Sequence, residues 1–244
     1  MFIRYHFFSS TCMGRVHYFA LSERGLQAIN NDAFCAEKVG KFHVFAVAGE
    51  RIGGPAGRLA GDIAIQTLKN AAQRNSRDPA EILENAVTEA DHMIGQRSSR
   101  DREHAGMGTD LCACLVDESL DCTILDTGNG SVYYVSPGIG IVLPSEIPFA
   151  DKAAGPIRKR IISHTLGEPY ILKGTELRKV NLQHSFIILS SAGLYDFAKR
   201  EDIRAIVEKN GENVETSCED LKNLALRAGS ERTITMVVLH GHPE

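Results

Sequence analysis

The chain has 244 residues, 43% of them apolar, and a formal net charge of −4. This length and apolar content suffice for one large domain with a substantial buried core, so we expect a single domain over residues 1–244. The slightly acidic charge, with Lys and Arg scattered among acids, argues against nucleic-acid binding and against a basic membrane-surface segment. The sequence contains no long uncharged apolar run, and we therefore expect a soluble, cytoplasmic protein.

The first part of the chain predicts strands followed by helices. Segments rich in aromatic and branched side chains are predicted strands: 2–8, 15–21 and 42–48. Segments whose apolar residues recur at helical spacing are predicted helices: 57–72, and 82–93 after the pair Asp78-Pro79. The polar stretch that follows, 95–108, is predicted to be a loop.

The second part of the chain begins with a block of short strands. Apolar runs separated by turn residues predict one antiparallel meander over 111–117, 122–128, 131–136 and 140–144. The remaining predicted elements are a helix at 154–167, a strand at 185–191, helices at 201–209 and 217–228, and a strand at 233–239. Strands in blocks and helices in blocks favour a layered α+β architecture.

Several short motifs occur in a fixed order along the chain. They are NND at 30–32, AGERIGGPAGRLAG at 48–61, GMGTDL at 106–111, GNGSVYYV at 128–135, FIILSSAGLYD at 186–196 and GSERTITMVVL at 229–239. Together they resemble, over nearly the whole chain, the metal-dependent serine/threonine protein phosphatases of the type 2C family. The resemblance implies a four-layer α-β-β-α sandwich, in which a central antiparallel β-sandwich is flanked by helices.

The same resemblance implies a catalytic centre of two Mn²⁺ or Mg²⁺ ions held mainly by aspartates, the oxygen ligands that hard cations prefer. The positions that match the family's metal-site acids carry Asn31, Gly49, Ala192 and Arg232 instead. The position that matches the family's phosphate-gripping arginine carries Gln27. A guanidinium in place of a carboxylate would repel a metal ion. We therefore expect no metal cofactor and no catalytic residues.

These substitutions lead to a leading functional hypothesis and two alternatives. The leading hypothesis is a catalytically inactive type 2C phosphatase-like protein that serves as a binding or regulatory module for a protein partner, including a phosphoprotein. The first alternative is an active phosphoserine/phosphothreonine phosphatase with Mn²⁺ or Mg²⁺ in a rearranged site built from Asp32, Glu50 and Asp110. A small-molecule or nucleotide-binding domain, suggested only by the glycine loops, is the weakest hypothesis.

Other chemically capable residues have simpler structural interpretations. Glu50 is expected to be a solvated loop acid, and Asp110 and Asp126 are expected to serve in local turns. His240 and His242 have the spacing of half a metal site, but we expect them to be exposed in a tail without a role. The six cysteines are irregularly spaced and are predicted to be mostly buried thiols of a reducing compartment.

Overall fold

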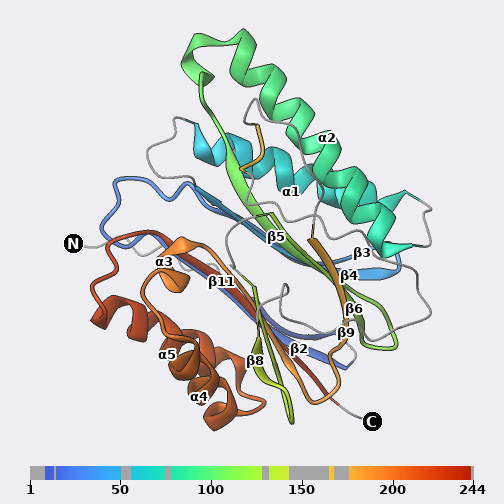
Figure 1. Ribbon diagram of the computed structural model, residues 1–244, viewed down its shortest axis with the longest axis vertical. Helices are drawn as coiled ribbons and strands as arrows, with labels where there is room; N and C mark the ends of the chain where they lie inside the picture. Colours follow the sequence, from blue (N-terminus) through green and yellow to red (C-terminus); the bar gives the residue numbers. More distant parts are fainter. Residues whose placement is uncertain are drawn as a thin grey trace.

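The protein is described by a computed structural model over residues 9–13, 15–50, 56–74, 78–127, 132–142, 165–167 and 176–242. Figure 1 shows two antiparallel sheets packed face to face, with helices over both outer faces. The architecture is therefore the predicted α+β fold, a four-layer α-β-β-α sandwich. None of the helices in the described ranges has the length and apolar character needed to cross a membrane.

The two sheets are formed from strands far apart in the sequence. Sheet A contains, in spatial order, β1 (Ser9–Met13), β2 (Val16–Glu23), β11 (Ile234–Gly241), β10 (Phe186–Ser190), β7 (Val132–Ser136) and β8 (Gly140–Val142). Sheet B contains β3 (Ala33–Val39), β4 (Phe42–Glu50), β5 (Thr109–Val116), β6 (Asp121–Asp126) and β9 (Glu176–Asn181). Neighbouring strands in both sheets are antiparallel.

The helices cover the outer faces in two groups. Sheet B carries α1 (Gly57–Gln73) and α2 (Pro79–Arg100), and the short 3₁₀ helix η1 (Arg102–His104) follows α2. Sheet A carries α3 (Ala192–Tyr195), α4 (Arg200–Asn210) and α5 (Val214–Arg227). Each layer therefore covers the apolar face of the next.

Local sequence signals explain where two of these helices begin. The Asp78 side chain accepts a hydrogen bond from the backbone N–H of Ala80 at 3.1 Å, and Pro79 occupies the first helical position of α2. Asn213 caps α5 in the same way, because its side chain accepts from the Thr216 N–H at 3.0 Å. These caps satisfy backbone donors that a helix start leaves without an intrahelical partner.

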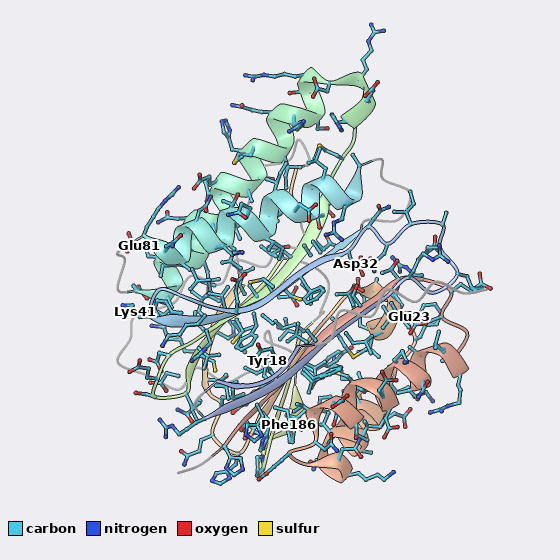
Figure 2. The ribbon with its side chains drawn as sticks, turned by 180° about the vertical axis from the view of Figure 1, so that it is seen from behind. Tyr18, Glu23, Asp32, Lys41, Glu81 and Phe186 are labelled. Carbon is cyan, nitrogen blue, oxygen red and sulfur yellow. The ribbon has the colours of Figure 1, made fainter. Side chains whose placement is uncertain are left out.

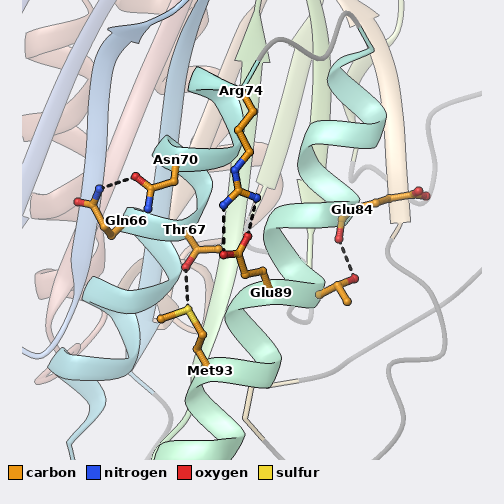
Figure 3. Close-up of polar contacts among 8 residues, drawn as sticks. Gln66, Thr67, Asn70, Arg74, Glu84, Glu89 and Met93 are labelled. Carbon is orange, nitrogen blue, oxygen red and sulfur yellow. Dashed lines mark hydrogen bonds and ion pairs between the residues drawn. The ribbon is translucent and has the colours of Figure 1, made fainter.

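Polar contacts on the outer surface tie α1 to α2 (Figure 3). Arg74 at the end of α1 forms an ion pair with Glu89 of α2, with Nη1 and Oε2 2.9 Å apart. The Thr67 hydroxyl donates to the Met93 sulfur at 3.9 Å. The exposed Arg74–Glu89 pair adds little stability, so the apolar faces of the two helices hold them in place.

Three hydrophobic clusters fill the spaces between the four layers. Leu68 belongs to the cluster between α1, α2 and sheet B, and Leu221 to the one between sheet A and α5. Between the sheets, the rings of Tyr18 and Phe45 pack edge to face with centroids 5.0 Å apart. Full burial of one such side chain contributes about 1.5–3 kcal/mol, so these clusters dominate the stability of the fold.

Several predicted elements differ from the structure. The strands predicted as one meander are divided, because β5 and β6 lie in sheet B whereas β7 and β8 lie in sheet A. The predicted loop 95–108 is partly helical, since α2 continues to Arg100 with polar residues that suit an exposed helix face. The elements β1, β3, β9 and α3 were not predicted. The predicted strand 2–8 and most of the predicted helix 154–167 lie outside the described residues.

A leucine pair on α5 tests the packing beneath sheet A. Leu221 is fully buried, whereas Leu226 on the same helix is 38% exposed. We expect Leu221→Ala to lower the free energy of unfolding by about 2–5 kcal/mol, because it removes buried methyl groups and leaves a cavity. Leu226→Ala is the matched control and should cost less than about 1 kcal/mol. Urea titration followed by circular dichroism measures both, and equal losses would contradict the assigned packing.

Candidate functional site

The segments that carry the family-like motifs converge at one end of the sandwich, here called the site end. Gly49 near the end of β4 pairs with Asp110 near the start of β5. In sheet A, β10 ends at Ser190 beside the start of β11 at Ile234. Figure 2 shows Asp32, which precedes β3, near this end. The fold therefore brings the motifs together although they are far apart in the sequence.

The two sheets approach each other closely at Gly49. A Cβ atom added to Gly49 would lie 3.3 Å from the Cβ of Ser191, which follows β10. Ser191 is held in place, because its N–H donates to the Thr235 carbonyl at 2.8 Å and its Oγ accepts from the Thr235 N–H at 3.0 Å. The Gly49 carbonyl in turn accepts from the Thr109 hydroxyl at 2.9 Å. A side chain at position 49 would be in tight contact with Ser191, which would have to shift by a few tenths of an ångström.

A buried polar chain holds the NND motif against sheet A. The Asn30 amide donates to the Ser22 hydroxyl at 2.8 Å, and the Ser22 and Thr235 hydroxyls lie 2.7 Å apart. Asn30 also accepts from the backbone N–H of Asp32 at 3.0 Å, and Arg58 donates to the Asp32 carbonyl at 2.9 Å. Asp32 itself is buried, and Asn31 is half-buried. This motif is therefore anchored by its first residue.

The loop after β2 is bonded to the loop that carries Arg232. The Leu26 N–H and the Gln27 side chain both donate to the Glu231 carbonyl, at 3.1 and 3.0 Å. Gly25 has φ of +62°, and a Cβ there would lie 2.4 Å from the Arg232 carbonyl oxygen. Glycine is therefore required at this contact. The Gln27 amide, at the position of the family's phosphate-binding arginine, is thus engaged with the protein's own backbone.

Arg232 forms an ion pair with Asp196, the residue that follows α3. The Arg232 side chain is 25% exposed and that of Asp196 is 43% exposed, so solvent reaches both. Arg232, from the GSERTITMVVL motif, is therefore paired with the last residue of the FIILSSAGLYD motif.

Carboxylates and Arg232 surround the phenol of Tyr195. Burial raises the pKa of Tyr195, Asp110 and Asp196 raise it further, Arg232 lowers it, and Asp126 raises it. Burial likewise raises the pKa of Tyr133 to about 12, where Arg200 lowers it and Asp126 and Asp196 raise it. Both phenols therefore remain protonated near neutral pH.

The structure corrects the expected turn role of Asp110. Asp110 lies within β5, opposite Gly49, and its Oδ1 accepts from the Thr165 hydroxyl at 2.8 Å. Asp126 is the last residue of β6 and is buried. Asp110 and Asp126 lie on the inner face of sheet B, because Asp126 pairs with Cys112, two residues along β5 from Asp110. The sequence missed this arrangement because it depends on strand pairing.

Two further contributors to the site were not predicted from the sequence. Ser191 follows the apolar run of β10 and contacts Gly49 across the sheets, and Tyr195 lies on the short helix α3. Their only sequence signal is their position inside the FIILSSAGLYD motif.

The described residues do not fit a two-metal centre of the kind the resemblance implies. Gly49 has no side chain and little room for one, Ala192 offers no oxygen ligand on its side chain, and Arg232 carries a positive charge. Within the described ranges, no three His, Cys, Asp or Glu residues are grouped so as to hold a metal ion. The Glu50 side chain lies outside what the structure describes.

Comparison with solved structures shows the class of fold. The chain matches Stp1 from Staphylococcus aureus with a TM-score of 0.76 and 19% identity, over 96% of this chain and 97% of that one. It matches the Mycobacterium tuberculosis phosphatase PstP/Ppp with a TM-score of 0.73 and 22% identity, over 93% and 99%. Both are serine/threonine phosphatases. No protein-family model and no curated protein matches the sequence.

A further match corrects the expectation that no metal cofactor is involved. The catalytic domain of PstP in complex with two manganese ions matches with a TM-score of 0.74 and 23% identity, over 93% of this chain and 99% of that one. A metal complex is thus known for this fold, and the expectation of none was wrong. It relied on counting side chains at a few motif positions, whereas hard cations also take backbone carbonyls and acids from other loops.

Gly193 in α3 tests the close packing at the site end. A Cβ on Gly193 would lie 2.0 Å from the Thr233 carbonyl oxygen, so Gly193→Ala must push α3 away from β11. We expect a loss of about 1–3 kcal/mol in the free energy of unfolding. Gly95→Ala within α2 is the control, since its nearest neighbour would be 3.9 Å away. It should raise stability by up to about 1 kcal/mol. Denaturant titration compares them, and a neutral Gly193→Ala would contradict the packing described.

Proposed function

We propose that this chain is a catalytically inactive, type 2C phosphatase-like protein whose site end binds a protein partner. The observation that carries the proposal is the Arg232–Asp196 ion pair. Arg232 stands where the resemblance puts a metal-binding aspartate, and its guanidinium is a group that binds anions. The fold itself supports the phosphatase-like class, and related scaffolds host different functions.

The partner we propose is a phosphorylated protein segment. A guanidinium binds phosphate through paired charge-assisted hydrogen bonds. Because Arg232 and Asp196 are both partly exposed, a phosphate group arriving from solvent can compete with the Asp196 carboxylate for Arg232. Gln27, in the adjoining loop after β2, donates its amide N–H to the carbonyl of Glu231, the residue before Arg232.

An active metal-dependent phosphatase is the second candidate, and the fold comparison is equally consistent with it. The observation that favours it is the position of Asp110, which lies directly opposite Gly49 across the β4–β5 pair. This carboxylate lies on β5, next to β4, which carries Gly49 at the position of the family's aspartate. With Asp32, and with Glu50 at the end of β4, it would provide oxygen ligands for Mn²⁺ or Mg²⁺.

We propose a cytoplasmic location, which is supported by the cysteines. Five cysteines in the described ranges, Cys35, Cys112, Cys114, Cys122 and Cys218, are buried and not in disulfides. Buried thiols without disulfides are usual in a reducing compartment.

Hydrolysis of an aryl phosphate across a Mn²⁺ titration separates the two candidates. We expect no rate above a chelator-treated blank, because the positions that match the family's ligands lack carboxylates. Binding of Mn²⁺ should be measured separately by calorimetry, so that metal binding without turnover is recognised. A rate that rises with Mn²⁺, disappears with chelator and is lost in Asp110→Asn would establish the second candidate instead.

Binding of a phosphoserine peptide library, compared with its unphosphorylated counterpart, tests the proposed partner. Arg232→Ala should weaken phosphopeptide binding about tenfold or more, the effect of losing a hydrogen bond to a charged group. Asp196→Asn should strengthen binding, because it removes the competing carboxylate. Arg204→Ala is the matched control, since Arg204 pairs with Glu208 on α4 at 2.7 Å. Fluorescence anisotropy measures each, and equal affinities for the Arg232 and Arg204 variants would refute the proposal.

A further inference from the structure

A cluster of histidines lies at the end of sheet A opposite the site end. His240 on β11 pairs directly with His17 on β2, and on its other side with Phe186 on β10. Side chains at directly paired positions share a face of the sheet. Because Phe186 belongs to the cluster beneath α4 and α5, His240 lies on the helix-covered face. In Figure 2, Phe186 is well separated from Asp32 and Glu23, which lie near the site end.

His240 is buried, which corrects the expectation of an exposed tail. It is only 8% exposed, and its ring packs against Phe186 with centroids 4.4 Å apart. Its Nδ1 atom is buried and has no hydrogen-bond partner among the described residues. The sequence missed this because β11 continues to Gly241, beyond the predicted end of the strand. An imidazole in this position has no group that stabilises a proton on Nδ1.

The turn between α4 and α5 docks onto the same end of the sheet. Glu212 in this turn contacts His242, with Oε1 and Nε2 2.7 Å apart. His242 is in turn close to both neighbouring rings, with centroids 5.2 Å from His17 and 6.2 Å from His240. Its backbone N–H donates to the Arg15 carbonyl at 2.8 Å. The turn is therefore joined to the end of the sheet through the contact between Glu212 and His242, and His242 in turn adjoins the other imidazoles.

Burial and the surrounding groups disfavour a proton on His240 while the turn is docked. The groups that act on His240 are the Glu212 carboxylate and three imidazoles, those of His242, His17 and His184. One carboxylate can neutralise one imidazolium. A proton on His240 would place a charge in an apolar site next to Phe186. The cluster is not a metal site as it stands, because no suitable group of three ligands occurs in the described ranges.

We propose that His240, His17, His242 and Glu212 form a proton-sensitive clasp, which holds the α4–α5 turn against sheet A at neutral pH and releases it in acid. The clasp is defined as these side chains together with the turn at 211–213. It is independent of the function proposed for the site end, because it uses different residues at the opposite end of β11.

The sign of the pH dependence follows from the burial of His240. Burial lowers the pKa of His240 below its ordinary value of 6.5, Glu212 opposes this, and the other imidazoles add to it. An opened clasp therefore binds a proton near pH 6.5 that the closed clasp does not bind. The stability of the closed state is complete above that pH and is lost as the pH falls. The Glu212 carboxylate stays ionised in mild acid, since the hydrogen bond from His242 lowers its pKa.

Hydrogen exchange at residues 211–216 and 240–242 tests the clasp in the full chain, as protection factors relative to intrinsic exchange rates. Below about pH 6.5, the factors should fall by up to about tenfold per pH unit, the limit for one linked proton. His240→Phe, which keeps a ring against Phe186, should abolish this dependence, and His240→Leu is the second variant if Phe is not accommodated. Glu212→Gln should lower protection at pH 7 but keep the pH dependence.

A histidine far from the clasp serves as the control. His92→Gln changes an exposed histidine on α2, where His92 contacts Gln96, and should leave the profile as in the unmodified chain. Two results would overturn the clasp. One is an unchanged pH dependence in the His240 variants. The other is acid loss of protection that is equal throughout the domain, which would indicate global unfolding instead of local opening.

Discussion

The close approach of the two sheets at Gly49 and Ser191 is the constraint on which the site end depends. A Cβ at position 49 would lie 3.3 Å from the Ser191 Cβ, which is closer than most side-chain contacts. Ser191 cannot move readily, because its backbone and hydroxyl are both bonded to Thr235. The missing side chain at position 49 and the close contact between the sheets therefore occur at the same point. A side chain restored at position 49 would require Ser191 to give way by a few tenths of an ångström.

The site end retains charges of both signs. Carboxylates gathered in one place repel one another, and each is stabilised by a nearby positive charge. Here Asp110, Asp126 and Asp196 all act on Tyr195, and Arg232 supplies the opposing charge. Arg232 is paired with Asp196 and remains partly exposed to solvent. This exposure is what allows an external anion to compete for it.

Much of the fold was predictable because it rests on local patterns. Helices α1, α4 and α5 follow from apolar spacing, and the order of the motifs identified the α-β-β-α sandwich. Contacts that depend on tertiary pairing were not predictable. No local signal assigns β7 and β8 to a different sheet from β5 and β6, or places Gly49 against Ser191. The partner of Arg232 and the burial of His240 depend in the same way on residues distant in sequence.

Strand β11 separates the two charged regions of the molecule. Arg232 precedes its first residue, and His240 lies near its last, so about 3.3 Å per residue places them about 26 Å apart. This exceeds the screening length of about 8 Å at physiological ionic strength. All residues of β11 are buried, and the strand is paired on both sides, so it does not bend easily. Protonation of the clasp therefore leaves the field at Arg232 nearly unchanged. A pH effect on phosphopeptide binding would then arise from the phosphate itself, whose second pKa is about 6.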